Sequence, residues 1–272
     1  MIPLKDQELI RQKFAAELLG PVKIDYFTER ELSLEVPGRR PCAYCKPVRE
    51  LLRELAALSE LISLRVHIFE EAADERTKFG VERIPGIVLR GAQQACAPTV
   101  AFKYYGMPGG TEFPAFLESI VDISRGDVLL SKESVKELRK VREVVVVRVF
   151  VTPTCGYCPQ MVRAAYQLSL ANAKVQAEVV EVNEFPELAD RYQVKVVPLT
   201  VILRPGSGQV ADKVAIPGAM HPDALVEQVV QASGAGVSER PAAAGPTSEV
   251  AAEEAPRAPQ RGEQRPSGLI IP

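Results

Sequence analysis

Apolar and polar positions along this chain follow a pattern that occurs twice and predicts the same series of elements each time. The first copy predicts a helix at 5–19, a strand at 22–28, a helix opened by Cys42, a strand at 64–69, a short helix, strands at 87–89 and 100–105, and a helix at 111–123. The second copy predicts a helix at 131–141, a strand at 144–152, a helix opened by Cys155, a strand at 175–182, a short helix, strands at 199–203 and 210–216, and a helix at 222–231. A strand, a helix and a strand in succession imply a parallel pair with a right-handed crossover in each copy.

Two short motifs support an internal duplication. Cys42-Ala-Tyr-Cys45 recurs 113 residues later as Cys155-Gly-Tyr-Cys158. The same offset carries Ile84-Pro85 onto Val197-Pro198, so a proline stands 43 residues after each first cysteine. Matching landmarks at one period indicate a tandem repeat. We therefore expect two units, at residues 1–125 and 126–232.

The remaining segment, residues 233–272, has a different composition. It is rich in Ala, Pro, Gly and Ser and contains no aromatic residue, so it cannot bury enough surface to offset its chain entropy. We expect a disordered tail. Its apolar end, Gly268–Pro272, leaves two interpretations open, a passive end and a docking peptide.

Composition and charge exclude several classes of function. A length of 272 residues with 46% apolar residues suits two ordinary cores, and a net charge of −2 argues against nucleic acid as a partner. The sequence contains no apolar run of about 18 residues and no signal peptide at its acidic N-terminus, so we expect no membrane contact and a cytoplasmic location. It contains no glycine-rich nucleotide motif, so we expect no bound cofactor.

The two Cys-x-x-Cys motifs carry the chemistry that the sequence predicts. A cysteine at a helix N-terminus has a lowered pKa, because the free N–H groups and the helix dipole favour the thiolate. Cys42 and Cys155 are therefore the candidate nucleophiles. Two intervening residues bring Cys45 and Cys158 over the same helical turn, where each can displace a mixed disulfide formed by the first cysteine.

The apolar–Pro pairs complete each candidate site. If the bonds before Pro85 and Pro198 are cis, each loop can lie against the disulfide and leave the preceding backbone free to pair with an extended substrate. Ile84 and Val197 would then supply the backbone groups that bind substrate.

Together these features resemble a known family. Each copy is similar to the thioredoxin/glutaredoxin fold, the segment from Phe150 to Pro159 is close to its pattern, and two intact motifs resemble the protein disulfide oxidoreductases. The resemblance implies an α/β fold of two tandem thioredoxin-like domains, each a mixed central sheet flanked by helices. It also implies dithiol–disulfide exchange on protein disulfides, of the reductase or isomerase type. NADPH would act indirectly through a thioredoxin reductase-like flavoenzyme, with a peroxiredoxin as a further partner. A related tandem fold in flavin-dependent peroxide-reducing systems keeps only one Cys-x-x-Cys.

Two departures from the family pattern leave alternatives open. The first copy has about 11 extra residues before Cys42, and Arg39 and Arg40 within them either lower the pKa of Cys42 or form a solvated loop. Asp25, with Val149 as its expected counterpart, is either a buried acid beneath Cys45 that takes its proton or a half-exposed strand residue.

Other residues carry weaker signals. Tyr44 and Tyr157 are interpreted as tuning groups that pack beside the sulfurs, with substrate contact as the alternative, and Cys96 as a bystander. We expect His67 to pack within its strand and His221 to stand at a helix start.

Two rival functions use the same residues. Four thiolates could hold one zinc ion, although zinc ribbons separate their pairs by only about 15–20 residues, so we expect no metal. A chaperone-like module could use the same two grooves, with redox chemistry secondary. Within the enzyme reading the sequence leaves open whether electrons flow toward reduction, oxidation or isomerisation, because the two central dipeptides do not fix a potential.

Overall fold

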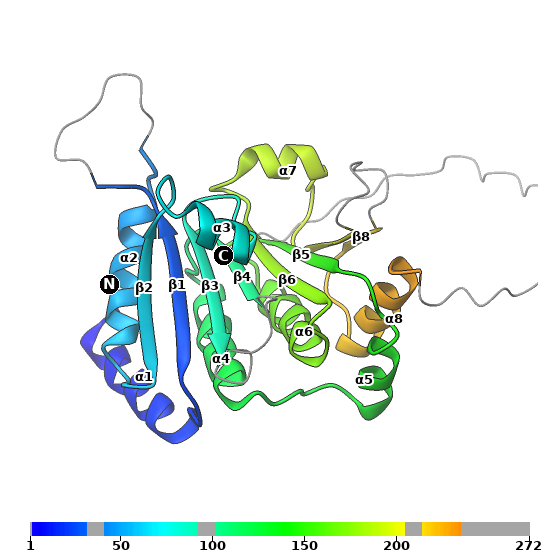
Figure 1. The fold of residues 1–272 in the computed structure, drawn as a ribbon, viewed down its shortest axis with the longest axis horizontal. Coiled ribbons are helices and arrows are strands. Elements are labelled where there is room, and N and C mark those ends of the chain that lie inside the picture. The colour runs from blue at the N-terminus through cyan, green and yellow to red at the C-terminus, as the bar shows by residue number, and fades with distance from the viewer. Residues whose placement is uncertain (1, 32–40, 92–101, 205–213, 235–272) are drawn as a thin grey trace, which may run out of the picture. The chain divides into compact units, whose positions relative to one another are not determined.

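An eight-stranded mixed sheet runs through the described part of this computed structural model, residues 2–31, 41–91, 102–204 and 214–234 (Figure 1). Its strand order is β2-β1-β3-β4-β6-β5-β7-β8. Contacts divide the chain into one unit at 1–238 and the segment 239–272, which lies outside the described residues. The predicted tail therefore falls almost wholly outside them, as do Arg39, Arg40 and Cys96.

Each copy forms one half of this sheet. The first half consists of α1 (Leu4–Glu17), β1 (Val22–Thr28), α2 (Cys45–Ala56), β2 (Ile62–Ile68), α3 (Ala73–Phe79), β3 (Gly86–Gly91), β4 (Phe102–Tyr105) and α4 (Glu112–Arg125). The second half consists of α5 (Lys132–Leu138), β5 (Val145–Val151), α6 (Cys158–Ala171), β6 (Val175–Glu181), α7 (Pro186–Tyr192), β7 (Leu199–Leu203), β8 (Val214–Pro217) and α8 (Pro222–Ala232).

The pairing is the same in both halves. β1 runs parallel to β2 and antiparallel to β3, and β5 runs parallel to β6 and antiparallel to β7. The parallel pairs expected from the strand–helix–strand pattern are therefore confirmed. β5, a run of valines broken by Arg148 and Phe150, is buried at every position because both of its faces are covered.

The two halves meet along one strand pair. β4 of the first half lies parallel to β6 of the second, with Phe102 opposite Ala177 and Tyr105 opposite Val180. The sequence predicted a sheet for each unit, and the structure joins the two into one. The chain leaves the first half at Gly126, whose φ of 69° lies in the left-handed region that favours glycine and ends α4.

Apolar side chains form a cluster on each face of the sheet. The larger cluster contains Ile24 and Tyr26 of β1 together with side chains from α1, α2, α4, α6 and α8. The smaller cluster contains Phe27 of β1 with Phe79 of α3 and Leu188 of α7. Neighbouring residues of β1 thus belong to opposite faces, as strand geometry requires.

Candidate redox centres

Each Cys-x-x-Cys motif closes as a disulfide, Cys42–Cys45 in the first half and Cys155–Cys158 in the second. In both centres the first cysteine is partly exposed, whereas Cys45 and Cys158 are only 2% and 0% exposed. An incoming thiol or disulfide can therefore reach the first sulfur and not the second. This asymmetry suits the roles expected from the sequence, an attacking first cysteine and a resolving second one.

The helices start later than the sequence suggested. α2 begins at Cys45 and α6 at Cys158, so each first cysteine lies in the turn just before its helix. In the second centre the Cys158 N–H donates to Cys155 Sγ at 3.1 Å. This bond stabilises a thiolate on Cys155 directly, as the free N–H groups of a helix start do in general.

Both apolar–Pro bonds are cis, as the sequence analysis expected. Pro85 and Pro198 are buried, and their carbonyls accept hydrogen bonds from Gly106 N–H and Gly218 N–H. The half-buried Ile84 and Val197 make no backbone hydrogen bond within the described residues. Their peptide groups therefore remain available to an extended segment of another chain.

The first centre has a carboxylate beside its accessible cysteine. Glu29, which directly follows β1, accepts the Cys42 N–H at 2.8 Å. Arg49 of α2 donates to the Glu29 carbonyl at 3.2 Å and pairs with Glu31 at 2.7 Å. The sequence analysis did not identify Glu29, because its only signal is that an acid follows the strand.

Asp25 does not lie where the sequence placed it. It is 1% exposed, so it is not a half-exposed strand residue, and its oxygens bind Arg90 Nε at 2.9 Å and His67 Nε2 at 2.8 Å. Its side chain lies on the α3 face with Phe27, opposite the face on which Tyr26 Oη donates to the Cys45 carbonyl at 2.6 Å. The expectation of an acid beneath Cys45 is therefore wrong.

Strand register explains this error. Asp25 pairs with Val88, and the matching residue of β7, Val201, pairs with Arg148. The structural counterpart of Asp25 is thus Arg148, while Val149 corresponds to Tyr26. The extra segment of the first copy is accordingly ten residues long, because β1 and β5 are offset by 123 and the cysteines by 113.

A buried carboxyl group stands at the start of α4, directly after a residue that contacts the loop of the second centre. Glu112 opens α4, is 1% exposed, and neither of its oxygens has a hydrogen-bond partner among the described residues. The preceding Thr111 donates its hydroxyl to the carbonyls of Pro153 and Cys155 at 3.1 and 3.0 Å. Further along the same helix, Asp122 binds Arg163 of α6 at 3.1 Å.

These contacts show that α4 and α6 run in the same direction, with the start of α4 near the start of α6. Burial raises the pKa of Glu112 to about 8. Comparing the two copies cannot reveal Glu112, because it belongs to the first copy in sequence whereas the helix that it opens contacts the second half.

Other buried polar groups lie near the joint of β4 and β6, and two of them, Tyr104 and Tyr166, interact electrostatically with Glu112. The hydroxyls of Tyr104 and Tyr166 and one oxygen of Glu184 have no hydrogen-bond partner in the described part of the chain. Burial raises the pKa of Glu184 to about 7, although the Met107 N–H, at 2.6 Å, works in the opposite direction. Buried polar groups without hydrogen-bond partners are rare in proteins, so a cluster of them calls for a structural or functional explanation.

The remaining candidates are placed as follows. The rings of Tyr44 and Tyr157 are 44% and 71% exposed, which favours the substrate-contact alternative over packing beside the sulfurs. His67 packs within β2, stacked on Phe27, and His221 is the N-cap of α8, both as expected.

Neither a metal cluster nor a membrane span emerges from the described residues. No three His, Cys, Asp or Glu side chains there come together as metal ligands, and no helix has the length and apolar character needed to cross a bilayer. A zinc site would need all four cysteines as thiolates around one ion, whereas each pair is here closed within its own motif.

Comparisons with known proteins identify the fold. Residues 145–231 match the Thioredoxin domain family, and no curated protein matches the chain. The NTD_N/C domain of alkylhydroperoxide reductase AhpF from Enterococcus faecalis is 22% identical with a TM-score of 0.69, and the match covers 84% of this chain and 100% of that one. A protein disulfide oxidoreductase from Aeropyrum pernix is 24% identical with a TM-score of 0.71, over 85% and 94% of the two chains. The expected tandem thioredoxin-like fold is thereby confirmed.

Proposed function

We propose that this chain is a thiol–disulfide oxidoreductase that exchanges dithiols and disulfides on protein substrates through two centres. One observation carries the proposal: each half combines a partly exposed first cysteine, a buried second cysteine and a cis-proline directly before the strand whose start pairs with the end of β1 or β5, the strand that leads to the motif. The residue before each proline makes no backbone hydrogen bond among the described residues. That combination provides a nucleophile, a resolving thiol and a groove for an extended chain.

In the reducing direction the exchange has two steps. The thiolate of Cys42 or Cys155 attacks one sulfur of the substrate disulfide, which forms a mixed disulfide and releases the other substrate sulfur as a thiolate that takes up a proton. The buried Cys45 or Cys158 then loses its proton and attacks the first cysteine. The internal disulfide forms again, and the substrate leaves with both of its sulfurs reduced.

We assign the proton transfer of the second centre to Glu112. A carboxylate accepts the Cys158 proton when that thiol attacks, and a carboxyl whose pKa is about 8 both accepts and returns protons near neutral pH. Glu112 stands at the start of α4, directly after Thr111, which donates its hydroxyl to the Cys155 carbonyl.

The reducing equivalents would come from a partner protein. We propose a thioredoxin reductase-like flavoenzyme that passes electrons from NADPH, and protein disulfides and a peroxiredoxin as acceptors, all in the cytoplasm. The similarity of the fold to a domain of an alkylhydroperoxide reductase and to a protein disulfide oxidoreductase supports this partner class. The two units of function are residues 1–125 and 126–232.

A redox titration tests the proposal and sets the direction of electron flow. The full chain is equilibrated in glutathione buffers, free thiols are alkylated, and each pair is quantified by mass spectrometry. Potentials near about −270 mV indicate a reductase, and values of about −180 to −120 mV an isomerase or oxidase. Cys42→Ser and Cys155→Ser variants, assayed for reduction of a disulfide-bonded test protein such as insulin, assign turnover to each centre. Failure of both pairs to form an internal disulfide at any potential would refute the proposal.

A further inference from the structure

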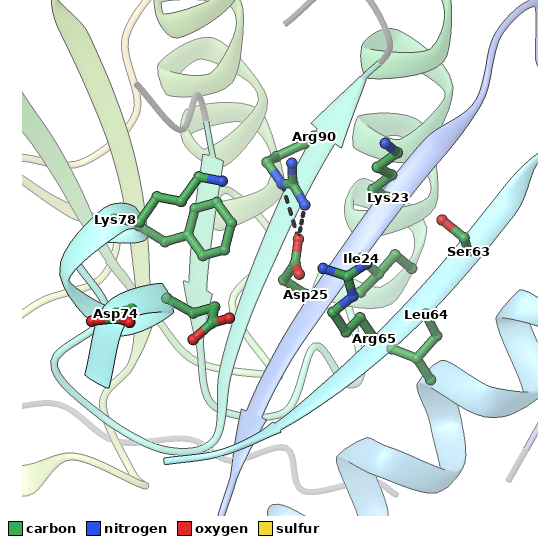
Figure 2. A pocket seen from close by; sticks show the side chains of 11 residues that line it. Lys23, Ile24, Asp25, Ser63, Leu64, Arg65, Asp74, Lys78 and Arg90 are labelled. Atoms are coloured by element: carbon green, nitrogen blue, oxygen red, sulfur yellow. Dashed lines mark hydrogen bonds and ion pairs between the residues drawn. The ribbon is translucent and has the colours of Figure 1, made fainter. Parts of the chain in front are cut away.

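A hollow of about 480 Å³ lies on the α3 face of the first half (Figure 2). No residue of either Cys-x-x-Cys motif lines it. Its walls come from the early parts of β1 and β2, the end of β3, and α3. The charged residues that line it are Lys23, Asp25, Arg65, Asp74, Glu75, Lys78 and Arg90. A volume of this size is in the range of small-molecule sites.

Four cationic side chains gather around this hollow. Lys23, Arg65 and Lys78 are exposed and have no hydrogen-bond or ion-pair partner within the described residues. Arg90 is bound to the buried Asp25, and its guanidinium lies 4.7 Å from the centre of the Phe79 ring. Figure 2 shows Arg90, Lys23 and Arg65 around Asp25, with Lys78 on the α3 side. Three carboxylates also line the hollow, the buried Asp25 and the more exposed Asp74 and Glu75 of α3, so the four cations exceed the acids by one charge.

The second half has a corresponding position on its sheet, and there the charged side chains form ion pairs. Glu178 and Arg148 occupy the positions that Arg65 and Asp25 occupy in the first half, because the parallel registers pair Arg65 with Asp25 and Glu178 with Arg148. There the Glu178 carboxylate binds Arg148 Nε at 2.8 Å and Lys103 Nζ at 2.6 Å, and all three are buried.

The first half has these charges exchanged: its acid, Asp25, stands on β1, and a cation, Arg65, takes the place of Glu178 on β2. β6 has β4 beside it, which supplies Lys103 and closes the site, whereas β2 is an edge strand and leaves the hollow open. In the second half a carboxylate thus lies between two cations on this face of the sheet, whereas the cation at the corresponding edge position, Arg65, has no ion-pair partner among the described residues.

We propose that the hollow binds a small organic anion with more than one carboxylate or phosphate group, held by Lys23, Arg65 and Lys78 over the Asp25–Arg90 pair. Paired cationic donors bind such groups through charge-assisted hydrogen bonds. Glu75, which also lines the hollow, selects ligands that add a hydroxyl or amino donor to their anionic groups. None of these residues belongs to the redox centres, so the site stands independently of the proposed function.

Calorimetric titration of the full-length oxidised chain tests the site, with citrate and inorganic phosphate as probes in about 150 mM salt to screen loose surface binding. We expect saturable binding of at least one probe at 1:1 stoichiometry, weakened at least about tenfold in Arg65→Gln/Lys78→Gln. Binding of citrate alone identifies a polycarboxylate site, and binding of phosphate a phosphate site; both support the proposal.

The matched control is Lys132→Gln/Arg139→Gln, which removes the same two charge types from exposed positions of α5 and its end. It should bind like the wild type. If the double variant of the hollow does not fold, the exposed Lys23→Gln alone is used, and a weaker affinity is again expected. No saturable binding of either probe, or equal losses in control and test variants, overturns the proposal. Disulfide reductase activity should be unchanged in all of these variants.

Discussion

At the scale of single residues, the two redox centres differ in the charges around their accessible cysteines. Cys42 lies beside the Glu29 carboxylate, whereas Cys155 Sγ accepts the N–H of Cys158. A neighbouring negative charge disfavours a thiolate, and a hydrogen bond to sulfur favours it. The two Cys-x-x-Cys motifs are therefore chemically distinct although their sequences differ at one position only.

Replacing Glu29 tests this difference. We expect Glu29→Gln to lower the pKa of reduced Cys42 by about one unit and to raise the potential of the first disulfide, because the reduced form gains stability. The pH dependence of iodoacetamide alkylation measures the pKa. Cys155 in the same variant is the internal control and should not change. An unchanged or higher Cys42 pKa would show that Glu29 acts only as a backbone cap.

The buried Glu112 makes the stability of the protein depend on pH, and the direction of its pKa shift determines the sign of that dependence. Its pKa in the folded chain, about 8, lies above the ordinary value of 4.5, so the folded state binds the proton more tightly than the unfolded state. The free energy of unfolding therefore falls as the pH rises from about 4.5 to about 8. Glu184, with a pKa of about 7, adds to this decline.

Glu112→Gln should remove most of the fall in unfolding free energy that the titration of Glu112 causes, which is on the order of a few kcal/mol. Urea unfolding at pH 5 and pH 8.5 measures it, with the exposed Glu133→Gln as control. The same variant should slow release of a mixed disulfide from Cys155 and leave Cys42 unaffected. A wild-type stability that stays flat across this pH range would contradict the assignment.

Residue positions also show where sequence reasoning stops. The four cysteines were predicted because two intervening residues bring both thiols over one helical turn, and the prolines because both copies place one 43 residues after the first cysteine. Asp25 was misplaced by a shift of one residue, and in a strand such a shift exchanges the two faces of the sheet. Glu112 was missed because it acts across the joint between the copies, which no comparison of one copy with the other can reveal.

At the scale of elements, the helix α4 belongs to the first half but helps to position the loop of the second redox centre. Its preceding turn passes so close to the loop before Cys155 that Thr111 N–H and hydroxyl both donate to the Pro153 carbonyl. Gly110 makes this approach possible, since a Cβ there would lie 2.2 Å from that oxygen, and its φ of 57° also excludes most side chains. Element order and most strand bounds were predictable, as β1 at Val22–Thr28 shows, but this cross-unit contact was not.

Gly110→Ala should therefore disturb the second centre selectively. We expect a loss of about 1–3 kcal/mol in unfolding free energy and slower turnover at Cys155, with the Cys42 centre unchanged. Gly109→Ala is the matched control, because its Cβ would meet nothing nearer than 3.7 Å and its φ is not positive. Urea unfolding and reductase assays of each variant in the Cys42→Ser background report the two effects. Equal behaviour of both alanine variants would contradict the role of this turn.

At the scale of the whole molecule, the joint between β4 and β6 contains a buried ion pair that links the halves. Lys103 of β4 binds Glu178 of β6, which also binds Arg148 of β5. Burial alone raises the pKa of Glu178, but Arg148 and Lys103 outweigh it and hold the pKa at about 2. Its contribution to stability is therefore complete above about pH 4.5 and is lost as the pH falls toward 2.

Lys103→Met tests whether this pair couples the two halves. The substitution keeps an unbranched side chain one atom shorter but leaves Glu178 with Arg148 as its cationic partner among the described residues, and breaking a buried pair in this way costs about 3 kcal/mol or more. We expect a lower unfolding free energy at pH 7 and a weaker loss of stability on acidification, because less of the pKa depression remains. Lys132→Met, at an exposed position of α5, controls for the loss of one charge.

The same variant separates coupling of the halves from local stability. If β4 and β6 hold the two units together through Lys103, urea unfolding of Lys103→Met should broaden or split, because the first and second halves then unfold at different concentrations. The fluorescence of Tyr26 and Tyr192, buried in different halves, follows each unit once the other tyrosines are replaced by Phe. A single sharp transition at lower urea would mean that the shared sheet keeps the halves cooperative without this pair.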